Sequence, residues 1–322
     1  MTSEEYRQLI LNSRKEQLTL TLENVTRLEK TFDTAIETLI AKIAALPVER
    51  QGTEWHRALF RLLSDTRAIT EGLKKDYETL LNLGMVELAQ NAASREAATA
   101  KLVNATTDAS LFPDLERTLS LSSGLSINVT FGRLALQAVE RAANRYYSDG
   151  LKLSDRLYKL SSSTKTLIED TITQGLIHGT SAPELAKQLR TTLMEAGSKN
   201  PKSDALRIAR TEIATSWREA HVLSTQTSPG VLKDYIEGLR WCLSAAHKQL
   251  DQCDLYATYD AGQGEGVYTP GDVPSSHPNC FCFLTTVLTN FPQSGISEMK
   301  PQPEGVPENQ RRIFNEQYPV AV

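Results

Sequence analysis

Apolar residues near the start of the chain follow a seven-residue repeat. Beginning at residue 18, they recur in steps of three, four and seven, on one face of a helix, over about four heptads. They are Leu18, Leu22, Val25, Phe32, Ile36, Leu39, Ile43 and Leu46. We expect one long helix over 3–46 that ends before Pro47, because proline cannot continue a helix.

A second stripe of apolar residues begins after a short polar connection. Its members share helical spacing and are Trp55, Leu59, Leu62, Ile69, Leu73, Tyr77 and Leu80. This pattern predicts a second helix, running to about residue 105, that folds back on the first as an antiparallel hairpin. The favoured interpretation is that both stripes form the core of a bundle. An oligomer formed through the N-terminal helices is the alternative.

The middle of the chain shows shorter helical stretches between breaks. Residues 106–131 read as irregular, and helices are expected over about 133–147, 164–178, 183–196 and 201–225. Ser181 and Glu184 have the spacing of a capping box, which marks the start of the third of these helices. Pro229-Gly230 is the next break.

Beyond residue 235 the pattern changes from helical to alternating. Two short stretches, 236–243 and 281–288, have the period of two that is typical of β-strands, and a glycine-rich loop over 262–271 lies between them. From residue 291 onward the chain is polar and rich in proline. This composition predicts an extended tail that is ordered only on a partner.

Composition narrows the classes of function. The chain has 322 residues and a formal net charge of −4, whereas a protein that coats nucleic acid is normally basic. The start lacks the basic and then apolar segments of a secretory signal, and no run approaches the roughly 20 apolar residues that span a bilayer. We therefore expect no membrane association, synthesis in a cytoplasm and no more than a local contact with nucleic acid.

All four cysteines lie between residues 242 and 282, together with two histidines. In a chain without a secretory signal, this clustering favours a metal site over a disulfide framework. Cys280 and Cys282 are two residues apart on a predicted strand, so both sulfur atoms face the same side. His277 precedes them across a proline-containing turn, and Cys253 comes from the other arm of the glycine-rich loop.

Thiolate and imidazole ligands in a closed shell of four are typical of structural zinc. The predicted ligands are Cys253, His277, Cys280 and Cys282, with His247 and Asp251 as alternates. A disulfide pair is one alternative to this site. The other is an ordinary core in which Cys242 and Cys253 are small buried residues and His277 caps a turn. From His247 to Cys282 there are five acidic residues and one basic residue, so a zinc finger that binds nucleic acid is not expected.

Motifs for other chemistry are weak or absent. The chain lacks the zinc-deaminase, His-Glu-x-x-His, Gly-x-Ser-x-Gly and Walker A patterns. Arg210 and Glu212 on the helix over 201–225 read more readily as ordinary paired helix charges than as a catalytic pair. The enzymatic alternative is a metal-dependent or thiol-dependent hydrolase or transferase with a site at His247, Asp251, Cys253 and His277.

The predicted fold class is mainly α with a small α+β module near the C-terminus. Its four parts are an N-terminal helical hairpin over 1–110, a helical domain over 111–235, a metal-binding β-hairpin module over 236–290 and an extended proline-rich tail over 291–322.

Several motifs between about 130 and 290 resemble one known family. The residues that carry the resemblance are Asp149-Gly150-Leu151-Lys152-Leu153, Arg210-Thr211-Glu212, Arg240-Trp241-Cys242-Leu243-Ser244, His247, Asp251-x-Cys253-Asp254, Gly266-Val267-Tyr268 and His277-Pro278-Asn279-Cys280-Phe281-Cys282. They are similar to the phage head-morphogenesis family, the minor capsid proteins like protein F of phage Mu. Many members have Cys-x-x-Cys where this chain has Cys253-Asp254-Leu255-Tyr256, which is why His247 is kept as an alternate ligand. Many also have Arg where this chain has Phe281.

The resemblance implies a low-copy virion component at the portal or in the capsid interior that is assembled in the host cytoplasm. Its partners would be portal or capsid proteins, and it would act in head assembly or genome delivery. On this view it is not an enzyme, and the metal module is structural. An ejected, DNA-associated protein or a host-directed effector is a further alternative.

Overall fold

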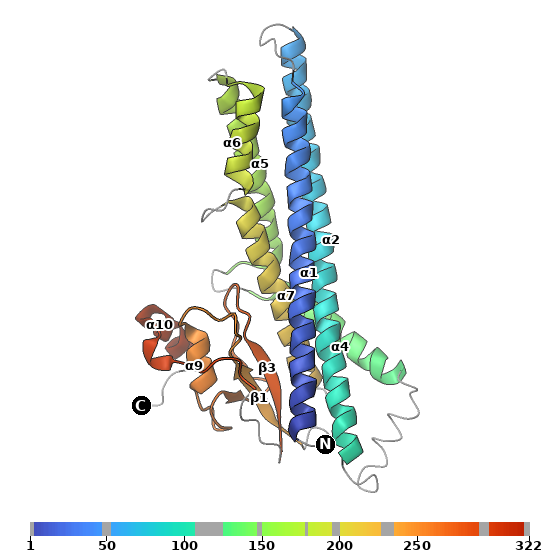
Figure 1. The fold of residues 1–322 in the computed structure, drawn as a ribbon, viewed down its shortest axis with the longest axis vertical. Helices are drawn as coiled ribbons and strands as arrows, with labels where there is room; N and C mark the ends of the chain where they lie inside the picture. The colour runs from blue at the N-terminus through green and yellow to red at the C-terminus, as the bar shows by residue number, and fades with distance from the viewer. Residues whose placement is uncertain are drawn as a thin grey trace. The chain divides into compact units, whose positions relative to one another are not determined.

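The computed structural model describes residues 3–46, 53–106, 125–146, 150–177, 180–194, 200–226, 235–289 and 296–318. These residues are mostly helical, with a small antiparallel sheet toward the C-terminus, which confirms the predicted fold class (Figure 1). The helices are α1 (Ser3–Ala44), α2 (Thr53–Thr106), α4 (Leu125–Asn144), α5 (Leu153–Ile177), α6 (Ala182–Met194), α7 (Pro201–Gln226), α9 (Gln252–Thr258) and α10 (Glu308–Gln317). The strands are β1 (Ile236–Cys242), β2 (Val267–Tyr268) and β3 (Phe283–Leu288), and a 3-10 turn, η2, spans Pro303–Gly305.

Two predicted boundaries are wrong. α4 begins at Leu125, inside the stretch that was expected to be irregular to residue 131, and α5 begins at Leu153 rather than near residue 164. Polar residues in the first turns of both helices weaken the apolar periodicity there. The predicted breaks at Pro47, at 107–124 and at Pro229-Gly230 lie outside the described residues.

The chain forms two compact units, each built from segments that are distant in sequence. One unit consists of Met1–Thr21, Met85–Ala142 and Ile213–Val322, and the other of Leu22–Gly84 and Ala143–Glu212. Each of the four predicted parts is one continuous segment of the chain, whereas each of these units combines two or three separate segments. In particular, the first turns of α1 and the second half of α2 belong to the same unit as the predicted metal module.

The second unit has the predicted apolar core. The heptad residues from Val25 to Ile43 in α1 are buried, together with apolar residues of α2, α5 and α6. Lys42 of α1 and Asp65 of α2 form an ion pair of 2.9 Å, as an antiparallel hairpin requires. The amide of Glu184 donates to the side chain of Ser181 (3.3 Å), so the Ser181 half of the predicted capping box of α6 is present.

The sheet of the first unit has the strand order β2-β1-β3, with both pairs antiparallel. Leu239 pairs with Tyr268 on one side of β1, and Cys242 pairs with Phe283 on the other. A bulge interrupts the pairing next to Gly238, where a Cβ atom would come within 2.7 Å of the Tyr268 carbonyl oxygen. The sheet therefore requires glycine at this position.

The extended tail predicted over 291–322 is wrong for its described part. This part contains η2 (Pro303–Gly305) and α10 (Glu308–Gln317), and α10 lies against α9, which in turn lies against β1 (Figure 1). Val306 and Phe314 are buried in the core of the module. The last proline before α10 is Pro307, at its N-cap position, and the helix itself contains no proline, so prolines do not interrupt it.

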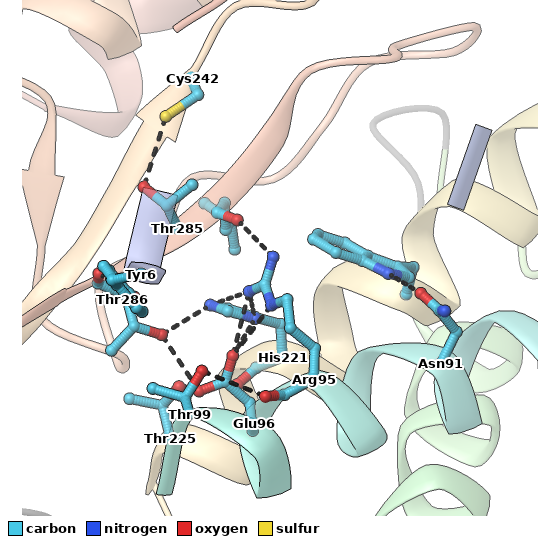
Figure 2. Close-up of polar contacts among 12 residues, drawn as sticks. Tyr6, Asn91, Arg95, Glu96, Thr99, His221, Thr225, Cys242, Thr285 and Thr286 are labelled. Carbon is cyan, nitrogen blue, oxygen red and sulfur yellow. Dashed lines mark hydrogen bonds and ion pairs between the residues drawn. The ribbon is translucent and has the colours of Figure 1, made fainter. Parts of the chain in front are cut away.

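A buried polar network attaches the long helices of the first unit to β3 (Figure 2). Arg95 and Glu96 of α2 meet His221 of α7, and Thr286 of β3 donates to Glu96 (3.1 Å). Arg95 also donates to the carbonyl of Leu284 (3.2 Å). Burial raises the pKa of Glu96, although the neighbouring Arg95 opposes this shift. The network explains why charged residues are tolerated between these helices and the sheet.

Candidate metal centre

The N-terminal cap of α9 positions the first predicted ligand. Asp251 occupies the N-cap, where its side chain accepts a hydrogen bond from the amide of Cys253 (2.7 Å). The side chain of Asp254 accepts from the amide of Asp251 (3.2 Å), which completes a capping box. This box fixes the first turn of the helix and therefore the direction of the buried Cys253 side chain.

A tight turn positions the other ligands. The amide of Cys280 donates to the carbonyl of His277 (3.2 Å), and Asn279 between them has a positive φ of 60°. Asparagine is one of the few side chains that tolerate this conformation. β3 begins at Phe283, so Cys280 and Cys282 lie in the segment just before the strand instead of on it as predicted.

The side chains of three cysteines and two histidines meet at this point. The sulfur atoms of Cys253 and Cys280 are 3.6 Å apart, and the sulfur of Cys282 is 3.9 Å from Nδ1 of His247. Cys253, His277 and Cys280 form one group whose ligand atoms lie within 4.8 Å of one another, and His247, Cys253 and Cys282 form another. The structure thus brings together Cys/His clusters that could hold a metal ion.

The two histidines differ in what their ring nitrogens face. Nε2 of His247 lies 2.8 Å from a carboxylate oxygen of Asp254, which leaves Nδ1 directed at the sulfur of Cys282. Nε2 of His277 lies 3.0 Å from Asp251, and its Nδ1 lies 2.8 Å from the carbonyl oxygen of Pro278. His247 therefore has the arrangement of a metal ligand that a carboxylate orients.

The thiols influence one another's ionisation. Burial raises the pKa of Cys253, and its cysteine neighbours raise it further. Hydrogen bonds from Cys253 and Cys282 lower the pKa of Cys280. For Cys282 the hydrogen bond with Cys253 acts to lower the pKa, but the interaction with Cys280 and burial outweigh it and the pKa is raised. Within the cluster the pKa of Cys280 is therefore shifted in the opposite direction from the pKa values of Cys253 and Cys282.

The pKa of His277 is raised by its neighbours. Burial alone would lower its pKa, but the hydrogen bond and charge of Asp251, together with Cys280, raise the pKa to about 10. In return, His277 lowers the pKa of Asp251 against the opposing effect of burial. Asp251, predicted as an alternate ligand, thus uses one oxygen as a helix cap and the other to pair with His277.

Among the described residues, neither the fourth cysteine nor the Arg-Thr-Glu motif belongs to these groups of possible metal ligands. Cys242 is buried on β1 with its sulfur 3.5 Å from the hydroxyl of Thr285, and burial raises its pKa to about 11. Among the described residues, Cys242 belongs to none of the groups with metal-ligand spacing. Glu212 is buried and pairs with Arg145 (3.3 Å), so the carboxylate of the motif has an ion-pair partner on another segment.

Sequence reasoning missed three residues that act on this site. Asp254 orients His247, and its three-residue spacing from Asp251 is a capping signal that could have identified it. Arg14 and Arg218 donate to backbone carbonyls between residues 280 and 282. No sequence motif marks these two arginines, because their contacts depend on tertiary packing.

Comparison of the chain with protein-family models, with curated proteins and with solved structures gives no match. The resemblance to head-morphogenesis proteins therefore rests on the sequence motifs alone. Within the described ranges, none of the helices combines the length and the apolar character that a bilayer crossing requires.

Proposed function

We propose that this chain is a minor head protein of a phage, and that a structural zinc ion stabilises its C-terminal module. The zinc centre is supported by the cluster geometry, above all by the separation of 3.6 Å between the sulfur atoms of Cys253 and Cys280. Two thiolates on one tetrahedral zinc ion lie about 3.8 Å apart, given Zn–S distances of about 2.3 Å. The head function is supported by the motifs between 130 and 290.

The proposed ligands are the sulfur atoms of Cys253, Cys280 and Cys282 and Nδ1 of His247. The side chain of His247 is 7% exposed, against 26% for His277. Its distance of 3.9 Å from the Cys282 sulfur is near the roughly 3.6 Å expected between nitrogen and sulfur ligands of one zinc ion. His277 was the histidine expected from the sequence, and in this proposal it stabilises the turn through Asp251.

The position of the centre favours a structural role over an enzymatic one. A metal ion at this point would link α9, the loop at His247 and the segment before β3. The tail is attached to the same place, because Asp254 accepts a hydrogen bond from the amide of Gln302 (2.8 Å). Cys280 is 3% exposed, so a substrate would have little access to its sulfur. A shell of three cysteines and one histidine has no open position, as is typical of structural zinc.

Cobalt substitution tests the ligand set. Cobalt(II) bound to three thiolates and one imidazole should give intense tetrahedral d–d bands and strong thiolate-to-cobalt charge transfer. Replacing His247 with Ala should shift the d–d bands and weaken metal binding by at least tenfold, whereas His277→Ala should change binding less. If His277→Ala weakened metal binding more than His247→Ala, the fourth ligand would be His277 instead of His247.

The head function calls for a test in the virus. Mass spectrometry of purified heads from a phage that encodes this chain should find it in low copy beside portal and capsid proteins. Disruption of the gene should reduce the yield of infectious particles, and the wild-type chain supplied in trans should restore it. Absence of the chain from heads and particles, with normal infectivity after disruption, would refute this function.

A further inference from the structure

Two buried arginines hold three successive carbonyl groups of the metal-binding segment. Arg218 of α7 donates through Nη1 to the carbonyls of Cys282 (2.9 Å) and Cys280 (3.4 Å). Arg14 of α1 donates through Nη2 to the carbonyl of Phe281 (2.7 Å). The two guanidinium groups therefore occupy all the carbonyls from residue 280 to residue 282.

This pattern fixes the rotation of the segment about its own axis. In an extended chain, successive carbonyls and successive side chains alternate in direction. Arg218 donates to the first and third of these carbonyls and Arg14 donates to the second, so the three carbonyls alternate in direction as those of an extended chain do. Because the backbone is held in this way, the side chains of Cys280 and Cys282 are directed together toward Cys253.

Other side chains hold the arginines in place. Nη2 of Arg14 also donates to the hydroxyl of Ser244 (2.8 Å), and its Nη1 donates to Gln17 (2.7 Å). Nη2 of Arg218 donates to the hydroxyl of Ser276 (2.5 Å), just before the turn that contains His277. The guanidinium of Arg14 lies 4.4 Å from the centre of the Phe283 ring. Protein side chains thus orient both guanidinium groups.

The charges around the segment give a second and independent observation. Arg14 and Arg218 are 3% and 5% exposed, and Arg14 has one carboxylate partner, Glu298, at 3.4 Å. Within the described part of the chain, Arg218 forms no ion pair with a carboxylate, and its partners are neutral oxygen atoms. A buried cation without a counter-charge is costly. One Zn²⁺ ion with three thiolates carries a net charge of −1, which would supply this counter-charge.

We propose that Arg14 and Arg218 are positioning residues of the metal centre, so that α1 and α7 complete a site whose ligands all lie between residues 247 and 282. The proposal rests on the zinc centre proposed above. It makes the metal affinity of the module dependent on the docking of the first turns of α1.

Zinc affinity of the full-length chain tests this proposal. Competition with a chromogenic chelator would give the Kd of the wild type and of the Arg14→Gln and Arg218→Gln variants. We expect each variant to bind zinc 10- to 100-fold more weakly, as for changes around the ligands of other metal sites. The matched controls are Arg7→Gln on α1 and Arg207→Gln on α7, whose side chains are 47% and 49% exposed. They should bind like the wild type.

Urea unfolding with and without zinc separates positioning from ordinary stabilisation. A residue that only stabilises the fold would lower both midpoints equally and leave the zinc-dependent shift unchanged. A positioning residue would reduce the shift itself, which is the result we expect. If the Gln variants fail to fold, Arg14→Lys and Arg218→Lys take their place. Lysine keeps the charge and loses the planar fork, and it should still weaken zinc binding.

The outcomes distinguish the two proposals. A wild-type chain that binds no zinc would overturn the metal centre and this inference with it. A wild-type chain that binds one zinc ion, with unchanged Kd and unchanged zinc-dependent shift in the folded Arg14 and Arg218 variants, would overturn this inference alone.

Discussion

Phe314 of α10 shows how strongly the tail is attached to the C-terminal module. Its side chain is 7% exposed and lies in a cluster of aromatic rings, with centroids at 5.7 Å from Tyr256, 5.4 Å from Tyr259 and 5.4 Å from Tyr318. Truncation of a buried phenylalanine to alanine costs about 3–5 kcal/mol. We expect the lower end, about 3 kcal/mol, for Phe314→Ala because a short helix at the edge of the module can partly close the cavity.

Urea unfolding of the zinc-loaded chain, followed by tryptophan fluorescence, would measure this loss. The Trp241 ring packs 5.2 Å from Tyr256 and so reports on the same cluster. With an m value of about 2 kcal/mol/M, the midpoint should fall by about 1.5 M. Ile313→Ala is the matched control, because Ile313 is adjacent and 38% exposed, and its loss should stay below about 1 kcal/mol. Equal losses for the two variants would refute the docking of α10.

Two other predictions concern buried charge and pH. Replacing Glu96 with Ala should lower the free energy of unfolding by about 3–5 kcal/mol in urea titrations, because Arg95 would stay buried without its carboxylate; a loss below about 1 kcal/mol would contradict this reading of the network. Zinc affinity should rise with pH, because the raised pKa values of Cys253 and Cys282 mean that both thiols must release protons when the metal binds. Calorimetry in buffers of different ionisation enthalpy would measure these protons, and an affinity that is independent of pH would contradict the thiolate ligands.

The N-terminal hairpin shows where periodicity succeeds and where it fails. The heptad predicts burial correctly from Val25 to Ile43, because this face packs in an apolar core. Nearer the N-terminus the predicted stripe is wrong, since Leu22 is 63% exposed while Arg14, Gln17 and Thr21 are buried. Polar residues that are buried and hydrogen-bonded carry no hydrophobic signal, so the sequence pattern could not reveal this face.

The proposed metal centre shows the same contrast between signals that are local in sequence and contacts that depend on tertiary packing. The clustered cysteines and histidines could be identified because they are the residue types that hold a metal ion and they lie close together in the sequence, and the turn at 277–280 is local. Arg14 and Arg218 reach the segment from helices that are distant in sequence, so no spacing could show them. In the tail, the many prolines led to the prediction of an extended chain, and α10 was missed. The spacing of Phe314 and Tyr318, one helical turn apart, was the available signal, and the two rings pack together.

The most direct test of the zinc centre is elemental analysis of the purified, freshly reduced chain, as wild type and as Cys280→Ser. We predict about one zinc ion per wild-type chain, and the loss of that ion in the variant together with a lower unfolding temperature. A wild-type chain that contains no metal and keeps its stability in the presence of a chelator would contradict the account, and the three clustered cysteines would then be residues of an ordinary core.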